Sequence, residues 1–401
     1  MFHTIGHTSS VRQAGGSRQM DRCGRYHGGM SPALLPLEEA LERLARAFPP
    51  PATGAILADR DDPALDRSSM DGAAMRSADG TSARTVLGTL FAGDAPSRFQ
   101  VTPGTCVRIM TGACLPAGAD CVVPLENLKE EAGLAPLTAP AAGDWVRHRG
   151  DQAPAGALLL PAGMPHNAAR AGLRAQVGLA PLPLRRVLVG IAPTGDEIQD
   201  PPAPHQIRDS NGPMLAALAH ALGADTRLLP PLPDDPASLE AFLGDLGDLD
   251  ILITSGGVSA GDKDHLPKVL ATLGARVLFH KIRLKPGKPM LAALLGRQVI
   301  LGLPGNPASS YLNALLFLPV AMAGLLGTAA PDPWKSGQLE AAVANPGDRP
   351  LLHPCLLRED RLRPLDYRGS ADLIRLAQAD VCAWIPAGGM AAGAVRYLNL
   401  L

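Results

Sequence analysis

The chain has 401 residues, more than a single hydrophobic core ordinarily organises, so we expect two to four domains. Hydrophobic residues make up 46% of it and charged residues 19%, a balance typical of a soluble globular protein. A formal net charge of -1 and an aromatic fraction of 3% argue against nucleic-acid binding, which uses basic surfaces and stacking platforms.

The first 29 residues are polar and lack the apolar centre of a secretory signal. We interpret them as a loose tail ahead of a biological start at Met30, and we expect a cytoplasmic protein. The six cysteines contain no CxxC pair, which favours free thiols in a reducing compartment over a metal site or a disulfide. They are Cys23, Cys106, Cys114, Cys121, Cys355 and Cys382.

Residues 30–60 and 145–180 are expected to form one elongated domain of helices and short strands. Its first helix is predicted within 31–48, where apolar residues recur at helical spacing between Pro36 and Pro49. A second helix is predicted at AARAGLRAQVG, residues 168–178.

The segment enclosed by these two pieces, residues 61–144, predicts a β-rich domain. Its short strands are RTVLGTL, TCVRIM and DCVVPLEN, with Gly, Pro and Asp between them.

Strands alternate with helices from residue 181 to 330, which predicts a doubly wound, mostly parallel α/β sheet. The strands are expected in RRVLVGIAP, ADTRLLPPL, LDILIT, ARVLFHKIRL and VILGL. A capped amphipathic helix is expected in DSNGPMLAALAHALGA, and further helices in PASLEAFLGDL, HLPKVLATLG and PASSYLNALLFL. The apolar stretch 311–326 carries Pro319 and follows a glycine loop, which favours a buried helix over a membrane span. Residues 331–401 return to short strands and turns and predict a small β-barrel-like domain.

Ligands of open α/β sheets bind beyond the carboxyl ends of the strands, so the loops at those ends carry the functional prediction. Four loops stand out: PTGDEI at 193–198, TSGGVSAGDKD at 254–264, KPGKP at 285–289 and LPGNP at 303–307. Glycines let a backbone approach a ligand, and the prolines make the last two loops stiff. Each loop alone also fits an ordinary turn, and no GxxxxGK[ST] motif supports a nucleotide P-loop.

Taken together, these loops combine groups of opposite charge. Lys285, Lys288 and the amides at helix starts suit phosphate or another oxyanion. The carboxylates of Asp196, Glu197 and the pair Asp262 and Asp264 do not bind anions directly. We therefore expect them to hold a divalent metal or to accept hydrogen bonds from the amino groups of a heterocycle.

The ordered set of motifs resembles the MoeA family, the molybdopterin molybdenumtransferases, which are related to the C-terminal domain of gephyrin. The matching elements are SSMDGAAMR, RIMTGACLPAGADCVV, GDQAPAGALLLPAG, TGDEI, DSN, TSGGVSAGDKD, KPGKP and LPGNP, in that order between about residues 36 and 330. The resemblance implies insertion of molybdate into adenylylated molybdopterin, assisted by Mg²⁺, with release of AMP. It also implies an elongated homodimer whose cleft lies between subunits, with molybdopterin adenylyltransferase and apo-molybdoenzymes as partners, and neither nucleic acid nor membrane.

The resemblance also implies residue roles. Catalytic roles fall on Asp71, Thr111, Asp151, Glu197, Asp235 (or, in the other register, Asp234) and Asp264. Substrate binding falls on Gly256, Gly257, Ser259, Gly261, Lys285, Lys288, Pro304, Gly305, Asn306, Pro307 and Ser309. Asp196, Glu197 and Asp264 are expected to hold Mg²⁺ or to orient the pterin.

Three departures from the family pattern put the detailed shape of the cleft in question. Ala73 stands where an aromatic residue is common, Pro193 replaces a small hydroxyl residue, and the terminal domain is short.

Two other functions fit parts of the pattern. One is the adenylyltransferase that makes the activated pterin and shares the α/β fold. The other is a non-catalytic carrier or scaffold for the cofactor.

Overall fold

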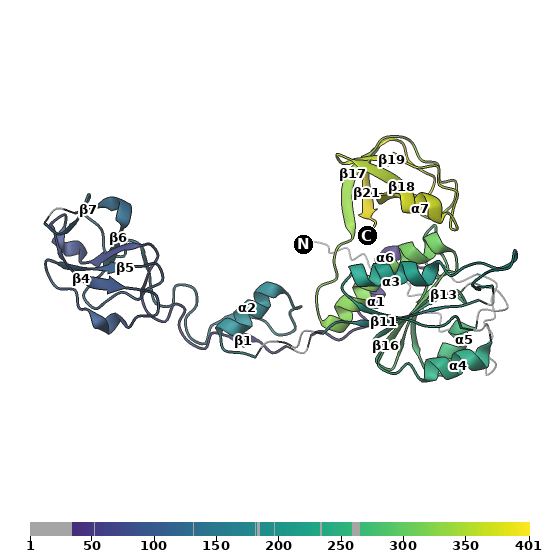
Figure 1. Cartoon of the computed structure of the whole chain (residues 1–401), viewed down its shortest axis with the longest axis horizontal. Coiled ribbons are helices and arrows are strands. Elements are labelled where there is room, and N and C mark those ends of the chain that lie inside the picture. The colour runs from purple at the N-terminus through teal and green to yellow at the C-terminus, as the bar shows by residue number, and fades with distance from the viewer. Residues whose placement is uncertain are drawn as a thin grey trace, which may run out of the picture.

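The computed structural model describes residues 34–51, 53–130, 132–180, 182, 185–195, 197–232, 235–258 and 265–401. Figure 1 shows an elongated chain with a β-rich domain at one end and an α/β domain at the other. A slender connecting domain joins them, and a C-terminal barrel lies beside the α/β domain (Figure 1). The predicted fold class, an α/β multidomain protein with β-rich parts and a small terminal barrel, is confirmed.

The β-rich domain is built on a four-stranded sheet in the order β4-β5-β3-β6. Its strands are β3 (Gly72–Met75), β4 (Thr85–Leu90), β5 (Thr105–Ile109) and β6 (Cys121–Pro124). A hairpin of β7 (Leu128–Glu130) and β8 (Leu134–Pro136) and three short 3₁₀ turns, at Ser77–Asp79, Pro96–Arg98 and Leu125–Asn127, complete it. Ala73 is fully buried in β3, between Arg108 of β5 and Val123 of β6.

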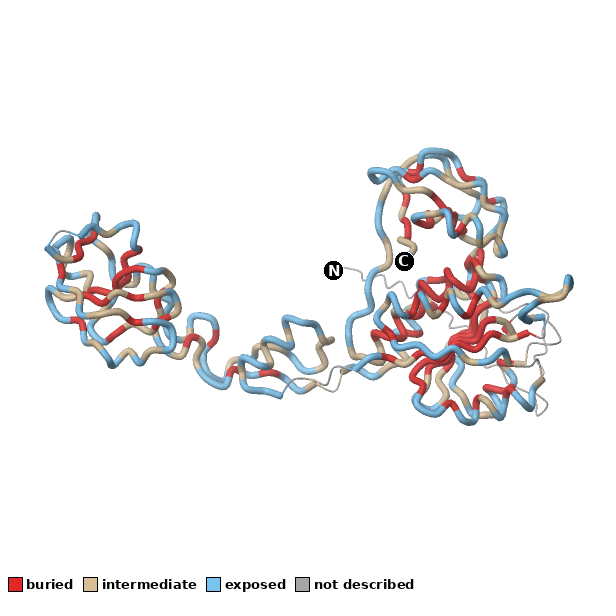
Figure 2. The backbone as a smooth tube through the Cα atoms, viewed as in Figure 1, coloured by how far each residue is buried: buried red, intermediate tan, exposed pale blue. Residues whose placement is uncertain are grey.

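The connecting domain consists of two minimal ladders and one helix. Strand β1 (Ile56–Leu57) pairs with β10 (Leu158–Leu160), and β2 (Arg67–Ser68) pairs with β9 (Val146–Arg147), both antiparallel. Helix α2 (Ala168–Gln176) begins at Asn167, whose side chain accepts the amide of Arg170. Short ladders with few buried side chains give this domain its thin cross-section (Figure 2).

The α/β domain contains a six-stranded sheet in the order β12-β11-β13-β16-β15-β14. Four parallel strands come first: β12 (Asp225–Leu228), β11 (Leu188–Pro193), β13 (Ile251–Ser255) and β16 (Gln298–Leu303). Strand β15 (Leu291–Leu295) runs antiparallel to β16, and β14 (Arg276–His280) pairs antiparallel with β15, so β14 runs in the same direction as the first four strands. Strand β15 was not expected from the sequence, because its run LAALL has no alternation that separates a buried strand from a buried helix.

Helices cover both faces of this sheet (Figure 1). Helices α3 (Asn211–Ala221), α6 (Pro307–Leu326) and α1 (Leu37–Ala45) share one apolar core with it. Helices α4 (Pro236–Gly244) and α5 (Leu266–Thr272) belong to the second core. Helix α1 buries Leu37, Ala40 and Leu44. It contributes to the α/β core even though the sequence groups it with the connecting domain.

Helix α3 is capped by Asp209 and not by Ser210, the residue directly before the helix. The side chain of Ser210 makes no capping hydrogen bond, and Asp209 Oδ1 accepts the Gly212 amide at 2.8 Å instead. The helix buries Leu215, Leu218 and Ala219 against the sheet and α6, but its exposed positions include Pro213 and Ala217, so its amphipathic character is weaker than predicted.

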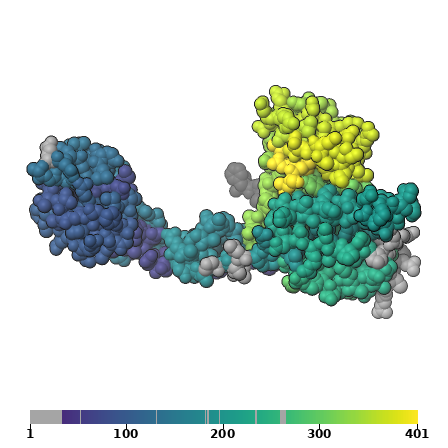
Figure 3. Space-filling model, in the orientation of Figure 1, coloured from purple at the N-terminus to yellow at the C-terminus, as the bar shows by residue number. Residues whose placement is uncertain are grey.

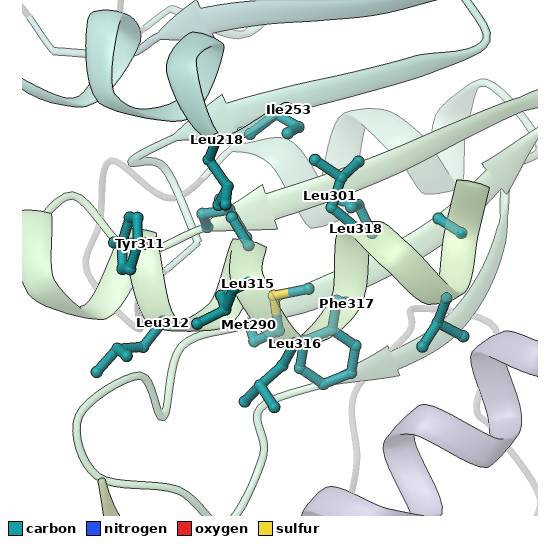
Figure 4. Close-up of a cluster of buried hydrophobic side chains, with 14 of the residues drawn as sticks. Leu218, Ile253, Met290, Leu301, Tyr311, Leu312, Leu315, Leu316, Phe317 and Leu318 are labelled. Atoms are coloured by element: carbon teal, nitrogen blue, oxygen red, sulfur yellow. The ribbon is translucent and has the colours of Figure 1, made fainter. Parts of the chain in front are cut away.

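Helix α6 is the centre of the larger core. Figure 4 shows Leu312, Leu315, Leu316 and Phe317 of this helix with side chains from the sheet and α3. It is long and apolar enough to cross a membrane, but 78% of its most apolar window is buried within the protein. The expectation of a buried core helix is confirmed. The five cysteines among the described residues are free, as expected.

The C-terminal domain is a closed barrel in the order β17-β19-β18-β20-β21, with helix α7 (Leu373–Gln378) beside it. The strands are β17 (Trp334–Leu339), β18 (Leu351–Arg358), β19 (Arg361–Pro364), β20 (Val381–Ile385) and β21 (Gly393–Asn399). The guanidinium of Arg396 lies 4.3 Å from the ring centres of both Trp334 and Trp384 and pairs with Glu38 of α1 at 2.7 Å. This contact fastens the barrel to the α/β domain.

Candidate functional site

The carboxyl ends of β11, β13 and β16 meet at one edge of the sheet, and their loops contact one another. The amide and the hydroxyl of Thr194 both donate to the Ser255 carbonyl at 3.1 Å. The Gly256 amide donates to the Leu303 carbonyl at 2.9 Å. A Cβ on Gly256, whose φ is +115°, would collide with Thr194 Oγ1, so only glycine lets these loops approach so closely.

Asn211 at the start of α3 ties two of these loops together. Its Nδ2 donates to Ser255 Oγ and to the Gly305 carbonyl, each at 2.8 Å. Its Oδ1 is buried with no hydrogen-bond partner among the described residues. A buried acceptor without a partner is costly and commonly marks a place where water or a ligand completes the network.

Glu197 lies on the loop after β11. Its carboxylate folds over Gly195, where a Cβ would collide with it. The loop borders an open cavity of about 510 Å³, lined by Gly195, Ile198, Gln199, Asp200, Asp209, Pro231 and Leu232. Pro193 ends β11, is buried, and accepts the Leu232 amide, so this departure from the family pattern supports the wall of the cavity.

The KPGKP loop reaches the same edge, because it leads into the antiparallel strand β15 and Leu291 pairs with Gly302 near the end of β16. Asn313 of α6 holds the loop, donating from Nδ2 to the Gly287 carbonyl at 3.1 Å. Lys285 is half-buried and Lys288 is exposed. The two lysines therefore lie on a loop whose backbone is held by a hydrogen bond from α6.

The LPGNP loop lies between the sheet and the barrel. Asn306 Nδ2 donates to Ser370 Oγ at 3.0 Å, and the Ala308 amide donates to the Ser370 carbonyl at 3.1 Å. Ser309 is buried inside the first turn of α6 and is 2% exposed, which limits its direct contact with a ligand. Ser370 was not predicted from the sequence. Only the packing of the barrel against α6 brings it here, and no local motif announces it.

A second constellation occupies the β-rich domain. Asp71 Oδ1 accepts from both the amide and the hydroxyl of Thr111, each at 2.7 Å. The Thr111 amide, and then its hydroxyl, hold the pKa of Asp71 below its ordinary value. The two predicted residues therefore form one exposed, ionised unit, 40 residues apart in the chain.

Two other predicted catalytic carboxylates have local structural partners. Asp151 Oδ2 accepts the His148 amide at 2.6 Å and closes a turn near the connecting domain. Asp235 Oδ1 accepts the Ser238 amide at 2.9 Å and caps α4. That amide lowers the pKa of Asp235. Asp151 therefore stabilises a turn and Asp235 caps a helix. The catalytic roles of both residues stay predictions.

Five predicted residues, Asp196, Asp234, Ser259, Gly261 and Asp264, lie outside the described residues, as do Asp262 and Lys263. No group of three or more metal-ligating side chains occurs within the described ranges. Of the three residues expected to hold Mg²⁺, Glu197 is the one whose position the structure gives.

The structure does not bring all predicted residues into one place. Glu197, the glycine loop, the lysines and the proline loop gather at the sheet edge. Asp71 and Thr111 belong to the β-rich domain. Figure 3 shows this domain, in purple and blue, at the far end of the molecule from the α/β domain. Within one chain, therefore, the two constellations do not form one cleft.

A doubly wound α/β domain with glycine and proline loops at its strand ends, joined to a β-rich domain and a small barrel, defines a multidomain α/β protein. Comparison with known proteins gives the family. Residues 35–178 match the MoeA N-terminal region, domains I and II, and residues 190–323 match the probable molybdopterin binding domain. The chain belongs to the MoeA family of molybdopterin molybdenumtransferases.

Individual relatives agree with this assignment. The chain is 35% identical to the molybdopterin molybdenumtransferase of Synechococcus elongatus, over 66% of this chain and 70% of that one. It is 37% identical to the Bacillus subtilis molybdopterin molybdenumtransferase, over 68% and 67%. The crystal structure of the molybdopterin biosynthesis MoeA protein from Pyrococcus horikoshii superposes with a TM-score of 0.65 at 27% identity, covering 91% and 99%. The chain is thus a transferase enzyme of molybdenum cofactor biosynthesis.

Proposed function

We propose that this enzyme inserts molybdate into adenylylated molybdopterin and releases AMP. In this reaction two Mo–S bonds replace two Mo–O bonds of molybdate, and the two oxides leave as water with the protons of the dithiol and of the medium. One water equivalent is used to hydrolyse the phosphoanhydride bond, so the products are the molybdenum cofactor, AMP and one net water. The observation that carries the proposal is the sheet edge, where the loops that hold Glu197, the glycines and the two lysines all lie at the same end of the sheet. A ligand with phosphates and an oxyanion needs this mixed set of charges.

The residues of the edge have separate tasks in this proposal. Lys285 and Lys288 attract phosphate and molybdate oxygens, and the stiff proline loops keep them in place before substrate arrives. Amides of the glycine loop that follow Gly256 bind phosphate oxygens, since the Gly256 amide itself donates to the Leu303 carbonyl. Asn211 Oδ1, buried and without a hydrogen-bond partner among the described residues, is available to accept a hydrogen bond from substrate or water.

The donor set fits Mg²⁺, which usually takes one or two protein carboxylates together with water and substrate phosphates. Glu197 would provide one such carboxylate, with Asp196 and Asp264 as the other proposed ligands. When bound, Mg²⁺ supplies positive charge that favours departure of the phosphate. Glu197 itself orients the bound groups from its place over Gly195.

The active cleft, we propose, is shared between two subunits. The separation of Asp71 and Thr111 from the sheet edge within one chain supports this arrangement, because a homodimer lets the β-rich arm of one subunit reach the α/β domain of the other (Figure 1). Molybdopterin adenylyltransferase would deliver the substrate, and apo-molybdoenzymes would receive the product, in the cytoplasm.

The test is an assay of AMP release from adenylylated molybdopterin by the purified chain. We expect release that requires both molybdate and Mg²⁺ and that Lys288→Ala reduces. Arg361→Ala is a matched control, since it removes an exposed cation on the barrel strand β19. Release independent of molybdate, or consumption of ATP with pterin alone, would contradict the proposal and favour the adenylyltransferase. Cofactor binding without any AMP release would favour the carrier.

A further inference from the structure

Exposed aromatic side chains are scarce in this chain. Among the aromatic residues in the described ranges, only Phe91 and Trp145 are exposed, by 57% and 49%. Phe91 belongs to the β-rich domain, and Trp145 lies at its border with the connecting domain, directly before β9. Since water disfavours such surface, two exposed rings in one small region call for an explanation.

The two rings belong to segments that flank the Asp71–Thr111 unit on opposite sides. The segment 68–71, which ends in Asp71, lies between the Thr111–Gly112 turn and the segment of Trp145. On one side Gly112 donates to the Ser68 carbonyl at 2.8 Å, and on the other the amide and hydroxyl of Ser69 both donate to the Trp145 carbonyl, at 3.0 and 2.8 Å.

Phe91 lies beyond the Thr111 turn. The Met110 amide donates to the Leu90 carbonyl at 3.0 Å, and a Cβ on Gly112 would touch Ala92 at 3.8 Å. The order across this surface is therefore the Phe91 segment, Thr111, the loop of Asp71, and Trp145.

Trp145 holds a backbone conformation that tryptophan rarely adopts. Its φ is +55°, in the left-handed region where glycine and asparagine are favoured and bulky residues are outliers. The two hydrogen bonds from Ser69 to its carbonyl fix this conformation. A strained and exposed tryptophan contributes little to folding, and strain of this kind concentrates at functional sites.

The centre of the surface is polar and has spare capacity. Thr111 occupies Oδ1 of Asp71, and no described residue donates to Oδ2. Leu125, 43% exposed, adds an apolar side chain, since its amide donates to the Asp71 carbonyl at 3.1 Å. Exposed aromatic and apolar side chains on segments next to a few fixed polar groups are a combination that small-molecule sites use.

We propose that Trp145 and Phe91 are stacking residues for a planar heterocycle of the substrate, with Asp71 Oδ2 accepting a hydrogen bond from its amino or ring N–H group. The inference rests on the proposed function and adds the part of the site that recognises a ring. A subunit contact alone explains the surface less well, because its centre is a carboxylate rather than a continuous apolar patch. Pterin and adenine share the required chemistry, and the test separates them.

Tryptophan fluorescence reads the contact directly, since Trp334 and Trp384 are the other two tryptophans and both lie in the barrel. We titrate the full chain with 6-hydroxymethylpterin, and separately with AMP, recording emission with inner-filter correction. The expected result is quenching by at least one ring in the wild type and loss of most of that quenching in Trp145→Phe. The ring that quenches identifies the half of the substrate that binds here.

Trp145→Asn separates binding from folding. Asparagine suits φ of +55°, so the variant is expected to melt no lower than the wild type, while Kd for the quenching ring rises about tenfold with the loss of one stacking partner. Binding to this variant is followed by equilibrium dialysis. Ile374→Ala, which trims a 66% exposed side chain on α7, is the control and should leave Kd unchanged.

Three results would overturn the inference: no quenching by either ring, unchanged Kd in Trp145→Asn, or dissociation of the dimer by Trp145→Asn with ring binding intact. The last would assign the aromatic pair to the subunit contact. Molybdate-dependent AMP release is measured in parallel on the wild type. Its failure with ring binding retained would therefore refute the proposed reaction and not the stacking residues.

Discussion

At the residue scale, the Asp71–Thr111 unit shows how a short turn sets the charge of a functional side chain. Two donors from one threonine converge on a single carboxylate oxygen. They stabilise the ionised form and leave the other oxygen for a ligand. The arrangement needs the TG turn after β5 and the MDG turn before β3 to lie side by side, which the pairing of Gly72 with Ile109 ensures.

We predict that Thr111→Val raises the pKa of Asp71 toward its ordinary value of 3.8, because the hydroxyl donor is lost while the amide remains. The pKa is measured from the side-chain carboxyl carbon by NMR titration. Thr105→Val removes a threonine hydroxyl that donates to the Thr102 carbonyl and should leave Asp71 unchanged. An unaltered Asp71 titration in Thr111→Val would show that the amide alone sets the pKa.

The lowered pKa of Asp71 also makes the stability of the folded protein depend on pH. Because the folded pKa of Asp71 lies below 3.8, its contribution to stability is present above that pH and is lost as the pH falls through the folded value. Thr111→Val should therefore lose stability relative to the wild type above pH 3.8, with the difference shrinking on acidification.

Residue roles are where sequence reasoning reached its limit. Two motifs singled out Asp71 and Thr111 separately, and only the structure shows that they pair. Asp151 and Asp235 accept backbone amides at a turn and a helix start. A carboxylate that caps a helix and one that binds a ligand look alike in a sequence. Ser370 carried no signal because its neighbours at the site come from another domain.

At the element scale, α6 connects the site to the core. Its first turn follows the LPGNP loop, Asn313 holds the KPGKP loop, and its later turns fill the space between the sheet, α1 and α3. Alternation of strands and helices predicted this domain. The antiparallel strand β15 was missed, since a strand of five apolar residues carries no period.

We predict that Phe317→Ala lowers the free energy of unfolding of the α/β domain by about 3–5 kcal/mol, the usual cost of removing a buried aromatic ring. Phe317 is fully buried and packs against Phe279 with ring centres 5.4 Å apart. Urea unfolding followed by circular dichroism measures the loss. Leu326→Ala, at the partly exposed end of the same helix, should cost much less. Equal losses would mean that α6 is not packed as described.

At the scale of the whole molecule, the chain is elongated and has one group of predicted site residues at each end. The Asp71–Thr111 unit lies in the β-rich domain, and Glu197 and the glycine and proline loops lie in the α/β domain. Periodicity and motifs predicted the domains that carry each constellation, but they say nothing about the distance between them. That distance follows from the thin ladders of the connecting domain, whose strands have only two or three residues each. A site assembled from both ends then requires two chains.

The last prediction tests that requirement by mixing damaged subunits. Asp71→Asn disables the β-rich arm and Glu197→Ala disables the sheet edge, so each variant dimer alone should be inactive. In a mixed dimer with shared clefts, one cleft carries both substitutions and the other carries neither. Random mixing should then restore about a quarter of wild-type AMP release, and purified mixed dimers about half. If each cleft were built within one chain, every cleft in the mixture would carry one substitution and no activity would return. Mixing either variant with itself, through the same unfolding and refolding steps, controls for recovery that has no relation to exchange of subunits.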